Sequence, residues 1–206
     1  MSMVPDNAIV LTFLGWAVSW MAAAGWRKTT IARPKGGAEL VHLAPTAAGV
    51  WMLFSTHASG EDPTRQVLNM QRLPYDPIQL WRTPLPVAWV LVGVALLGFL
   101  FCWWARVHLG TLWSGTVTVK PDHRVVDTGP YRLVRHPIYT GLLLAVAATA
   151  VEKGALLNVV GFALIFIGLW IKARMEEGFL RSNLGAEAYD AYAKRTPMLV
   201  PFMPRP

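Results

Sequence analysis

The chain has 206 residues, of which 54% are hydrophobic and 15% are charged, and its formal net charge is +7. A soluble domain usually carries about 25% charged residues, so the composition excludes an ordinary water-coated globule and points to a bilayer or an exceptionally buried core. The single cysteine excludes an internal disulfide, and no Cys/His set has the spacing of zinc ligands.

Apolar segments long enough for a bilayer, which takes roughly 20 residues, follow one another along the chain. The first three are at 8–26, 40–56 and 86–105. The first has no basic stretch before it and no small-residue cleavage site after it, so it predicts a retained helix and not a signal peptide. A last apolar block, 138–171, is interrupted by Glu152-Lys153-Gly154, and this charged turn predicts a helical hairpin.

These segments predict an all-α protein, a polytopic integral membrane helix bundle of about five transmembrane helices with a C-terminal hairpin and a cytoplasmic polar tail. We expect residues 1–206 to form a single membrane domain. Within it, residues 1–105 carry three spans, and residues 106–206 carry a polar loop, the hairpin and the tail. Gly154, Gly161 and Gly168 recur every seven residues. This stripe favours close helix packing, although glycine is also simply commoner in membrane helices.

The basic residues predict the orientation of the chain. With five spans and the N-terminus outside, the segments 27–39, 106–137 and 172–206 are cytoplasmic, and they hold fifteen of the nineteen Lys and Arg residues. This asymmetry satisfies the positive-inside rule and places the C-terminus in the cytoplasm, with a bacterial inner membrane as the expected location. Because the charge flanks the membrane ends, its expected partner is membrane lipid and not nucleic acid.

Polar motifs flank the hairpin on both sides. Arg135-His136-Pro137 and Tyr139 stand before it, and Glu176-Glu177 follow it. A tight hairpin returns its two ends to one membrane face, so these motifs are expected to be neighbours. Basic groups at a helix start suit an anion, and paired carboxylates suit a cation or ribose hydroxyls. S-adenosylmethionine matches this set, and a dinucleotide fits almost as well; taken singly, each motif also fits a plain membrane flank.

The segment 129–141, Gly-Pro-Tyr-Arg-Leu-Val-Arg-His-Pro-Ile-Tyr-Thr-Gly, together with Glu176-Glu177, resembles the isoprenylcysteine carboxyl methyltransferase family, which is related to membrane phospholipid N-methyltransferases. The tail residues Gly185, Tyr189, Tyr192, Arg195 and Pro197 extend the resemblance, which covers about residues 125–202. It implies an S-adenosylmethionine-dependent integral membrane methyltransferase with a lipophilic small-molecule or lipid substrate. The methylated group would be a carboxylate, an amine or a thiol.

The resemblance also implies that residues 106–206 include a cofactor-binding loop, and it implies which residues form the site. The expected cofactor-binding residues are Tyr131, Arg135, His136, Pro137, Tyr139, Gly141, Glu176, Glu177, Tyr189 and Tyr192, with no metal. Arg174 is the catalytic candidate, because it can pair with a substrate carboxylate, although it also fits a topological flank.

Two other functions stay open. Membrane sterol reductases have a similar Arg-His-Pro-x-Tyr region and use NADPH, so a reductase is the alternative enzyme. A non-catalytic membrane binding protein is the third possibility. No glycine-rich loop follows a strand, so a Rossmann-type methyltransferase is excluded. The proline-containing segment 57–85 fits either an external loop or a re-entrant one.

Overall fold

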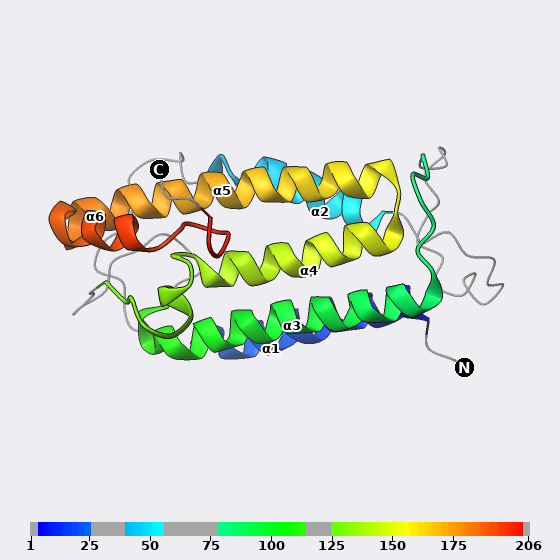
Figure 1. Ribbon diagram of the computed structural model, residues 1–206, viewed down its shortest axis with the longest axis horizontal. Coiled ribbons are helices and arrows are strands. Elements are labelled where there is room, and N and C mark those ends of the chain that lie inside the picture. The colour runs from blue at the N-terminus through cyan, green and yellow to red at the C-terminus, as the bar shows by residue number, and fades with distance from the viewer. Residues whose placement is uncertain (1–3, 26–39, 56–77, 114–124, 204–206) are drawn as a thin grey trace.

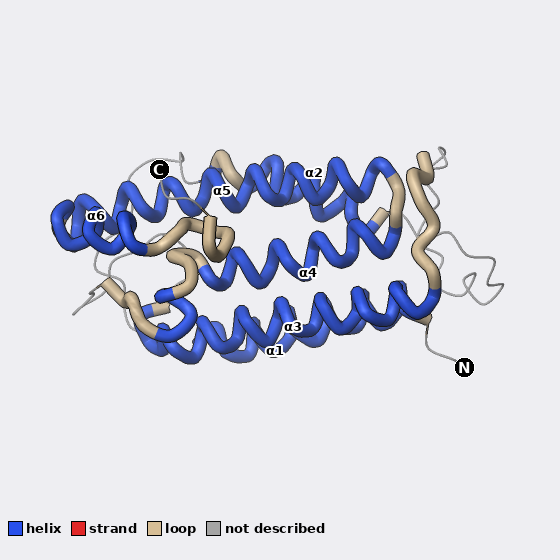
Figure 2. Tube along the Cα trace, viewed as in Figure 1, coloured by secondary structure: helices blue, strands red, loops and turns tan. Residues whose placement is uncertain are grey.

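A computed structural model describes residues 4–25, 40–55, 78–113 and 125–203, so most of segment 57–85 lies outside the described residues. The described residues form helices and loops (Figure 2). One isolated bridge pairs Gln79 with Ala155. The elements in chain order are α1 (Pro5–Ala22), η1 (Ala23–Gly25), α2 (Leu43–Phe54), α3 (Leu85–Leu109), η4 (Gly110–Leu112), η5 (Gly129–Arg132), α4 (Pro137–Lys153), α5 (Leu156–Leu184) and α6 (Ala186–Arg195). The predicted all-α helix bundle is confirmed.

A helix stands at each of the five predicted spans, but their lengths differ. Three segments are long and apolar enough to cross a membrane: Pro5–Gly25, Leu85–Leu112 and Leu156–Leu184. The helix α2 has 12 residues and α4 has 17. At 1.5 Å per residue, α2 is roughly 18 Å long, which is shorter than a hydrocarbon core of about 30 Å. The helices thus make an integral membrane protein, with α2 as a short member of the bundle.

The helices run alternately in opposite directions (Figure 1). α1, α3 and α5 point one way, and α2 and α4 point the other way; α4 lies between a layer of α2 with α5 and a layer of α1 with α3. The end of α3, the start of α4, the end of α5 and all of α6 therefore gather at one end of the bundle, which we call the α6 end. The described residues of two predicted cytoplasmic segments, 106–137 and 172–206, lie at this end, whereas segment 27–39 lies outside the described residues.

The turn between α4 and α5 lies at the opposite end and is more buried than its charges suggest. α4 ends at Gly154, whose φ of 66° is the left-handed conformation that glycine adopts at helix ends. The Nζ atom of Lys153 lies 2.9 Å from Oδ1 of Asp6 in α1, and both side chains are buried. Glu152 is also buried in the last turn of α4. The charged turn that predicted the hairpin is therefore buried, because α1 supplies a partner for the lysine.

The glycines of α5 confirm close packing against α2. A Cβ at Gly161 would stand 2.8 Å from the Gly49 carbonyl oxygen, and one at Gly168 would stand 3.0 Å from the His42 carbonyl oxygen. Two backbones can approach this closely because neither glycine carries a side chain. Gly154 does not belong to this contact, since α5 begins after it.

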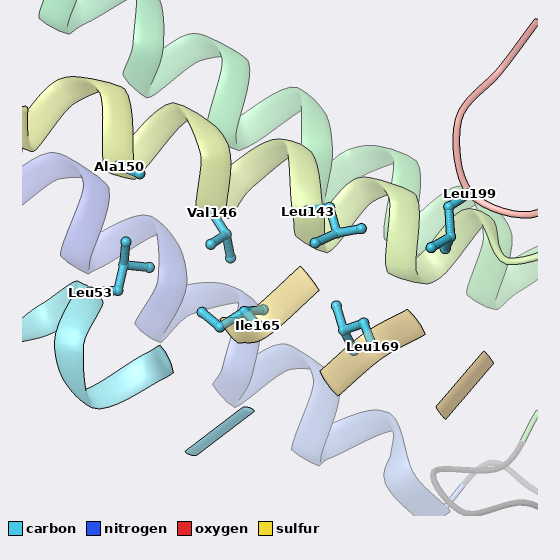
Figure 3. Packing of buried hydrophobic residues seen from close by; sticks show 7 residues of the cluster. All are labelled: Leu53, Leu143, Val146, Ala150, Ile165, Leu169 and Leu199. Atoms are coloured by element: carbon cyan, nitrogen blue, oxygen red, sulfur yellow. The ribbon is translucent and has the colours of Figure 1, made fainter. Parts of the chain in front are cut away.

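The largest buried cluster joins α2, α4, α5 and the C-terminal tail (Figure 3). Its members are Leu53, Leu143, Val146, Ala150, Ile165, Leu169 and Leu199. Leu199 follows α6 in the chain, so the tail returns to the apolar core after that helix. This return holds the α6 end of the hairpin together.

The helix α5 is longer than expected. The apolar block is predicted to end at Ile171, but α5 continues through the polar residues that follow to Leu184. Lys, Arg, Met and Glu are good helix formers, and Lys172 and Glu176 stand at the favourable i, i+4 spacing. The helix therefore carries its polar residues beyond the apolar segment as one rigid rod.

Candidate functional site

The two polar motifs that flank the hairpin meet at the α6 end. His136 is the residue before α4, and Glu176 and Glu177 lie in the last third of α5. Nε2 of His136 lies 3.2 Å from Oε1 of Glu177, and Nδ1 lies 3.5 Å from Oε2 of Glu176. The imidazole thus bridges two carboxylates. The expectation that the hairpin makes these residues neighbours is confirmed.

Arg135 and Tyr139 complete the group. The Nε–H of Arg135 donates to Oε1 of Glu177 at 2.6 Å, and the Tyr139 hydroxyl donates to Oε1 of Glu176 at 2.7 Å. The Tyr139 ring is stacked on the His136 ring, with centroids 5.4 Å apart and planes 3° apart. We call Arg135, His136, Tyr139, Glu176 and Glu177 the charged cluster.

The side chains of the charged cluster are mostly buried, and a small fraction of their surface is exposed to solvent. Side-chain exposure is 8% for Arg135 and His136, 11% for Glu177 and 18% for Glu176. Burial by itself lowers the pKa of His136, but hydrogen bonds to Glu176 and Glu177 and the charges of both carboxylates together raise this pKa above its ordinary value. When His136 is protonated, its charge and that of Arg135 offset the charges of the two carboxylates.

The C-terminal tail supplies hydrogen-bond acceptors to the residues just before α4, a contact that the sequence analysis does not predict. The N–H groups of Arg135 and His136 donate to the carbonyls of Pro197 and Met198, at 2.9 and 3.1 Å. The Arg135 guanidinium also donates through Nη1 to the carbonyls of Ala193 and Thr196, at 3.0 and 2.6 Å. These N–H groups are therefore satisfied by the protein itself. No side-chain pattern indicates such pairing, because the acceptors are backbone carbonyls.

The predicted tyrosines lie beside the charged cluster, between α6 and η5. The Tyr192 hydroxyl donates to the Tyr131 carbonyl at 2.7 Å, and the Tyr189 and Tyr192 rings meet edge to face at 6.2 Å. All three side chains are buried, and burial raises the pKa of each phenol. These contacts fix α6 against the loop before α4.

The remaining predicted site residues have separate surroundings. Pro137 is buried as the first residue of α4. Gly141 faces α3, where an added Cβ would collide with the Gly98 carbonyl oxygen and stand 2.7 Å from Sγ of Cys102. The Arg174 side chain is exposed and lies over the Trp170 ring, 6.0 Å from its centroid. Gly141 therefore has a packing function, whatever else it does.

Lys172 is a neighbour that the sequence motifs did not single out. Its Nζ atom lies 5.4 Å from the centroid of the Tyr139 ring, one turn before Glu176 on α5. The i, i+4 spacing to Glu176 was a signal that could have identified it. In the described ranges, no group of three His, Cys, Asp or Glu residues has an arrangement suited to a metal ion.

Comparison with known proteins gives a consistent result. Residues 90–182 match the isoprenylcysteine carboxyl methyltransferase (ICMT) family. A Bradyrhizobium diazoefficiens protein named methanethiol S-methyltransferase 2 is 34% identical over 139 residues, which cover 61% of this chain and 51% of that protein. A probable protein-S-isoprenylcysteine O-methyltransferase of Oryza sativa is 30% identical over 120 residues, which cover 57% and 62%.

The cobalt-zinc-cadmium resistance protein CzcN of Cupriavidus metallidurans is also similar, with 28% identity over 123 residues covering 59% of this chain and 51% of that protein. The chain thus aligns with between half and two thirds of the length of these relatives. The family match begins in α3 and ends near the end of α5, so it includes the hairpin and the whole charged cluster. The predicted resemblance to the isoprenylcysteine carboxyl methyltransferase family is confirmed by the match over residues 90–182, which make up slightly less than half of the chain.

Proposed function

We propose that this protein is an S-adenosylmethionine-dependent methyltransferase that methylates a lipophilic acceptor at the membrane, with the charged cluster in its cofactor site. The observation that carries the proposal is the bridging of Glu176 and Glu177 by His136 at one end of the α4–α5 hairpin. The family match and the methyltransferase names of two relatives support this reaction class.

The donor set of the charged cluster fits the proposed cofactor. Glu176 and Glu177 are the carboxylates that can attract a cation or accept from ribose hydroxyls, and each retains some solvent exposure. His136 and Arg135 hold these carboxylates in place, so a bound cation does not have to order them. S-adenosylmethionine, when bound, would supply a methyl group on a positively charged sulfur, and a lone pair of the acceptor would form a bond to the methyl carbon as the bond between that carbon and the sulfur breaks.

The chain's own contribution is positioning and exclusion of water. Tyr139 holds the Glu176 carboxylate through its hydroxyl at 2.7 Å, and the stacked His136 ring restricts Tyr139 in turn. Arg135 connects Glu177 to the C-terminal region, since its guanidinium contacts the carboxylate, the Ala193 carbonyl in α6 and the Thr196 carbonyl after it. The two glutamates are thus fixed by separate supports before any ligand arrives.

The acceptor is proposed to enter from the lipid, and the cofactor from the aqueous side of the α6 end. The names of the relatives indicate sulfur of methanethiol or a carboxyl oxygen of isoprenylcysteine as their acceptors, so we favour a thiol or a carboxylate here. Arg174 is the basic residue proposed to orient an anionic acceptor. In this proposal the α6 end faces the cytoplasm and the N-terminus lies outside.

Binding of labelled S-adenosylmethionine to the purified protein tests the cofactor assignment. Glu176→Gln keeps an oxygen acceptor for Tyr139 but removes the negative charge, so we expect at least tenfold weaker binding, about 1.4 kcal/mol, at a temperature where both proteins are folded. Glu187→Gln, at an exposed position of α6, is the matched control and should bind as the wild type does. Equal affinity in all three proteins would contradict the assignment.

Two further measurements separate the alternatives. Thermal stabilisation by S-adenosylhomocysteine but not by NADPH distinguishes the methyltransferase from a reductase, because a ligand stabilises only a protein that binds it. Release of S-adenosylhomocysteine with a membrane extract distinguishes an enzyme from a binding protein. Mass spectrometry of that extract with a deuterated methyl donor then identifies the acceptor, and Arg174→Gln should raise KM for it without changing cofactor affinity.

A further inference from the structure

The C-terminal strap, which we define as residues 196–203, connects the charged cluster to an exposed apolar tip. Its first residues are bound to the start of α4: Pro197 and Met198 accept from the Arg135 and His136 amides, and the Leu199 carbonyl accepts from Oγ1 of Thr140 at 2.6 Å. In Figure 1 the strap (red) runs between α4 and the layer that contains α5. The strap is therefore an integral wall of the candidate site.

The strap is anchored in the apolar interior of the bundle. The Leu199 side chain is 5% exposed and belongs to the core cluster with Leu143 and Leu169 (Figure 3). Thr140 and Leu143 stand three and six residues into α4, roughly 5–9 Å beyond its start. The strap thus reaches the level of the first two turns of a helix that lies inside a membrane bundle.

Beyond Leu199 the apolar side chains turn outward. The exposed fractions are 43% for Val200, 94% for Phe202 and 57% for Met203. Phe202 has a φ of 64°, a left-handed backbone that is unusual for an aromatic residue. A backbone bond from the Met203 N–H to the Val200 carbonyl, at 3.4 Å, closes this turn. The fold therefore displays a phenyl ring and a thioether away from its own core.

A membrane surface fits this tip better than water does. The strap is continuous with the membrane bundle through Leu199, and exposed Lys194 and Arg195 precede it at the end of α6. Apolar side chains that insert at the boundary of headgroups and acyl chains, next to cationic residues that meet anionic headgroups, are the usual pattern of interfacial anchors.

We propose that residues 200–203 are an interfacial membrane anchor, which inserts Val200, Phe202 and Met203 among the lipid headgroups and thereby holds the strap against the charged cluster. When the tip is inserted in lipid, the strap stays hydrogen-bonded to the backbone of Arg135 and His136 and keeps that backbone ordered. It does not depend on which ligand the cluster binds.

The chain offers a clean labelling strategy, because its single cysteine, Cys102, is buried. In a Cys102→Ala background, Phe202→Cys carries a nitroxide label at the tip, and Glu187→Cys carries one on exposed α6. Both proteins are reconstituted in phosphatidylcholine vesicles with and without phosphatidylglycerol. Label 202 should be more accessible to oxygen than to a water-soluble nickel complex, and label 187 should show the reverse. Equal water exposure at both positions would overturn the anchor, as would protection of label 202 from both reagents, which indicates a protein partner.

Hydrogen exchange tests the coupling without any activity measurement. Phe202→Asp should accelerate exchange of the Arg135 and His136 amides in vesicles by about tenfold, since a carboxylate cannot replace the phenyl ring in the interface. Phe202→Leu keeps an apolar side chain and should exchange at the wild-type rate. If Phe202→Asp leaves both amides as protected as they are in the wild type, the tip does not hold the strap and the proposal fails.

Discussion

Replacing Gly98 with alanine is expected to force α3 and α4 apart where their backbones lie closest. An added Cβ would stand 2.5 Å from the Gly141 carbonyl oxygen and 3.1 Å from the Ala145 nitrogen, whereas ordinary contact begins at 3.4 Å. Both neighbours are helix backbone and cannot rotate away. The helices must therefore separate by almost 1 Å at this crossing.

The cost of this separation exceeds the gain from alanine. Overpacking a tight contact typically costs about 1–3 kcal/mol, while alanine in place of glycine in a helix gains roughly 0.5–1 kcal/mol. We expect a net loss of about 1–2 kcal/mol for Gly98→Ala. Gly93→Ala is the matched control on the same helix, because its Cβ meets nothing within 4 Å, and it should be neutral or stabilising.

Reversible unfolding in mixed micelles measures both variants. Gly141→Ala, on the other side of the crossing, should lose a similar amount, and the double variant should lose less than the two single losses together, because one separation relieves both clashes. If Gly98→Ala is as stable as Gly93→Ala, the close approach of α3 and α4 is refuted. A loss of cofactor binding in Gly141→Ala without any loss of stability would instead assign Gly141 to the site.

The remaining predictions concern buried polar groups. Lys153→Met removes the ammonium 2.9 Å from the Asp6 carboxylate and should cost roughly 3–5 kcal/mol in unfolding measurements; Asp6→Asn added to it should recover some of this loss, and no recovery would show that the two residues do not act as a pair. The raised pKa of His136 stabilises the native state below the ordinary histidine pKa of about 6.5, and this stabilisation is lost as pH rises through the higher native value. The thermal stability of the wild type should therefore fall toward alkaline pH more than that of His136→Gln. Identical pH profiles of the two proteins would count against a protonated His136. Asn158→Leu removes hydrogen bonds to the Met52 and Leu53 carbonyls of α2, at 3.3 and 3.1 Å, and should cost about 1–2 kcal/mol, whereas an unchanged unfolding free energy would make this amide dispensable.

The membrane class and the charged cluster followed from the sequence because both depend on local features. Apolar stretches report burial in lipid residue by residue, and the interruption at Glu152-Lys153-Gly154 fixed the hairpin that pairs His136 with Glu176 and Glu177. The residue at which α5 ends could not be predicted from the sequence, because the same polar residues suit either a helix in water or an irregular segment. The burial of the turn between α4 and α5 could not be predicted for a related reason: the sequence shows the charge of Lys153 but does not show that Asp6 lies beside it.

By itself, the sequence determined that the chain lies in a membrane, that its last two spans fold back, and which charged residues meet there. These results need only the hydrophobicity of each segment and the shortness of one connection. The tertiary structure decided that Gly141 packs on α3, that Asp6 neutralises Lys153, and that the C-terminal strap supplies carbonyls to Arg135 and His136. Such contacts join backbone atoms or distant segments. The residue types alone do not predict these contacts, because they form only when the helices pack against one another.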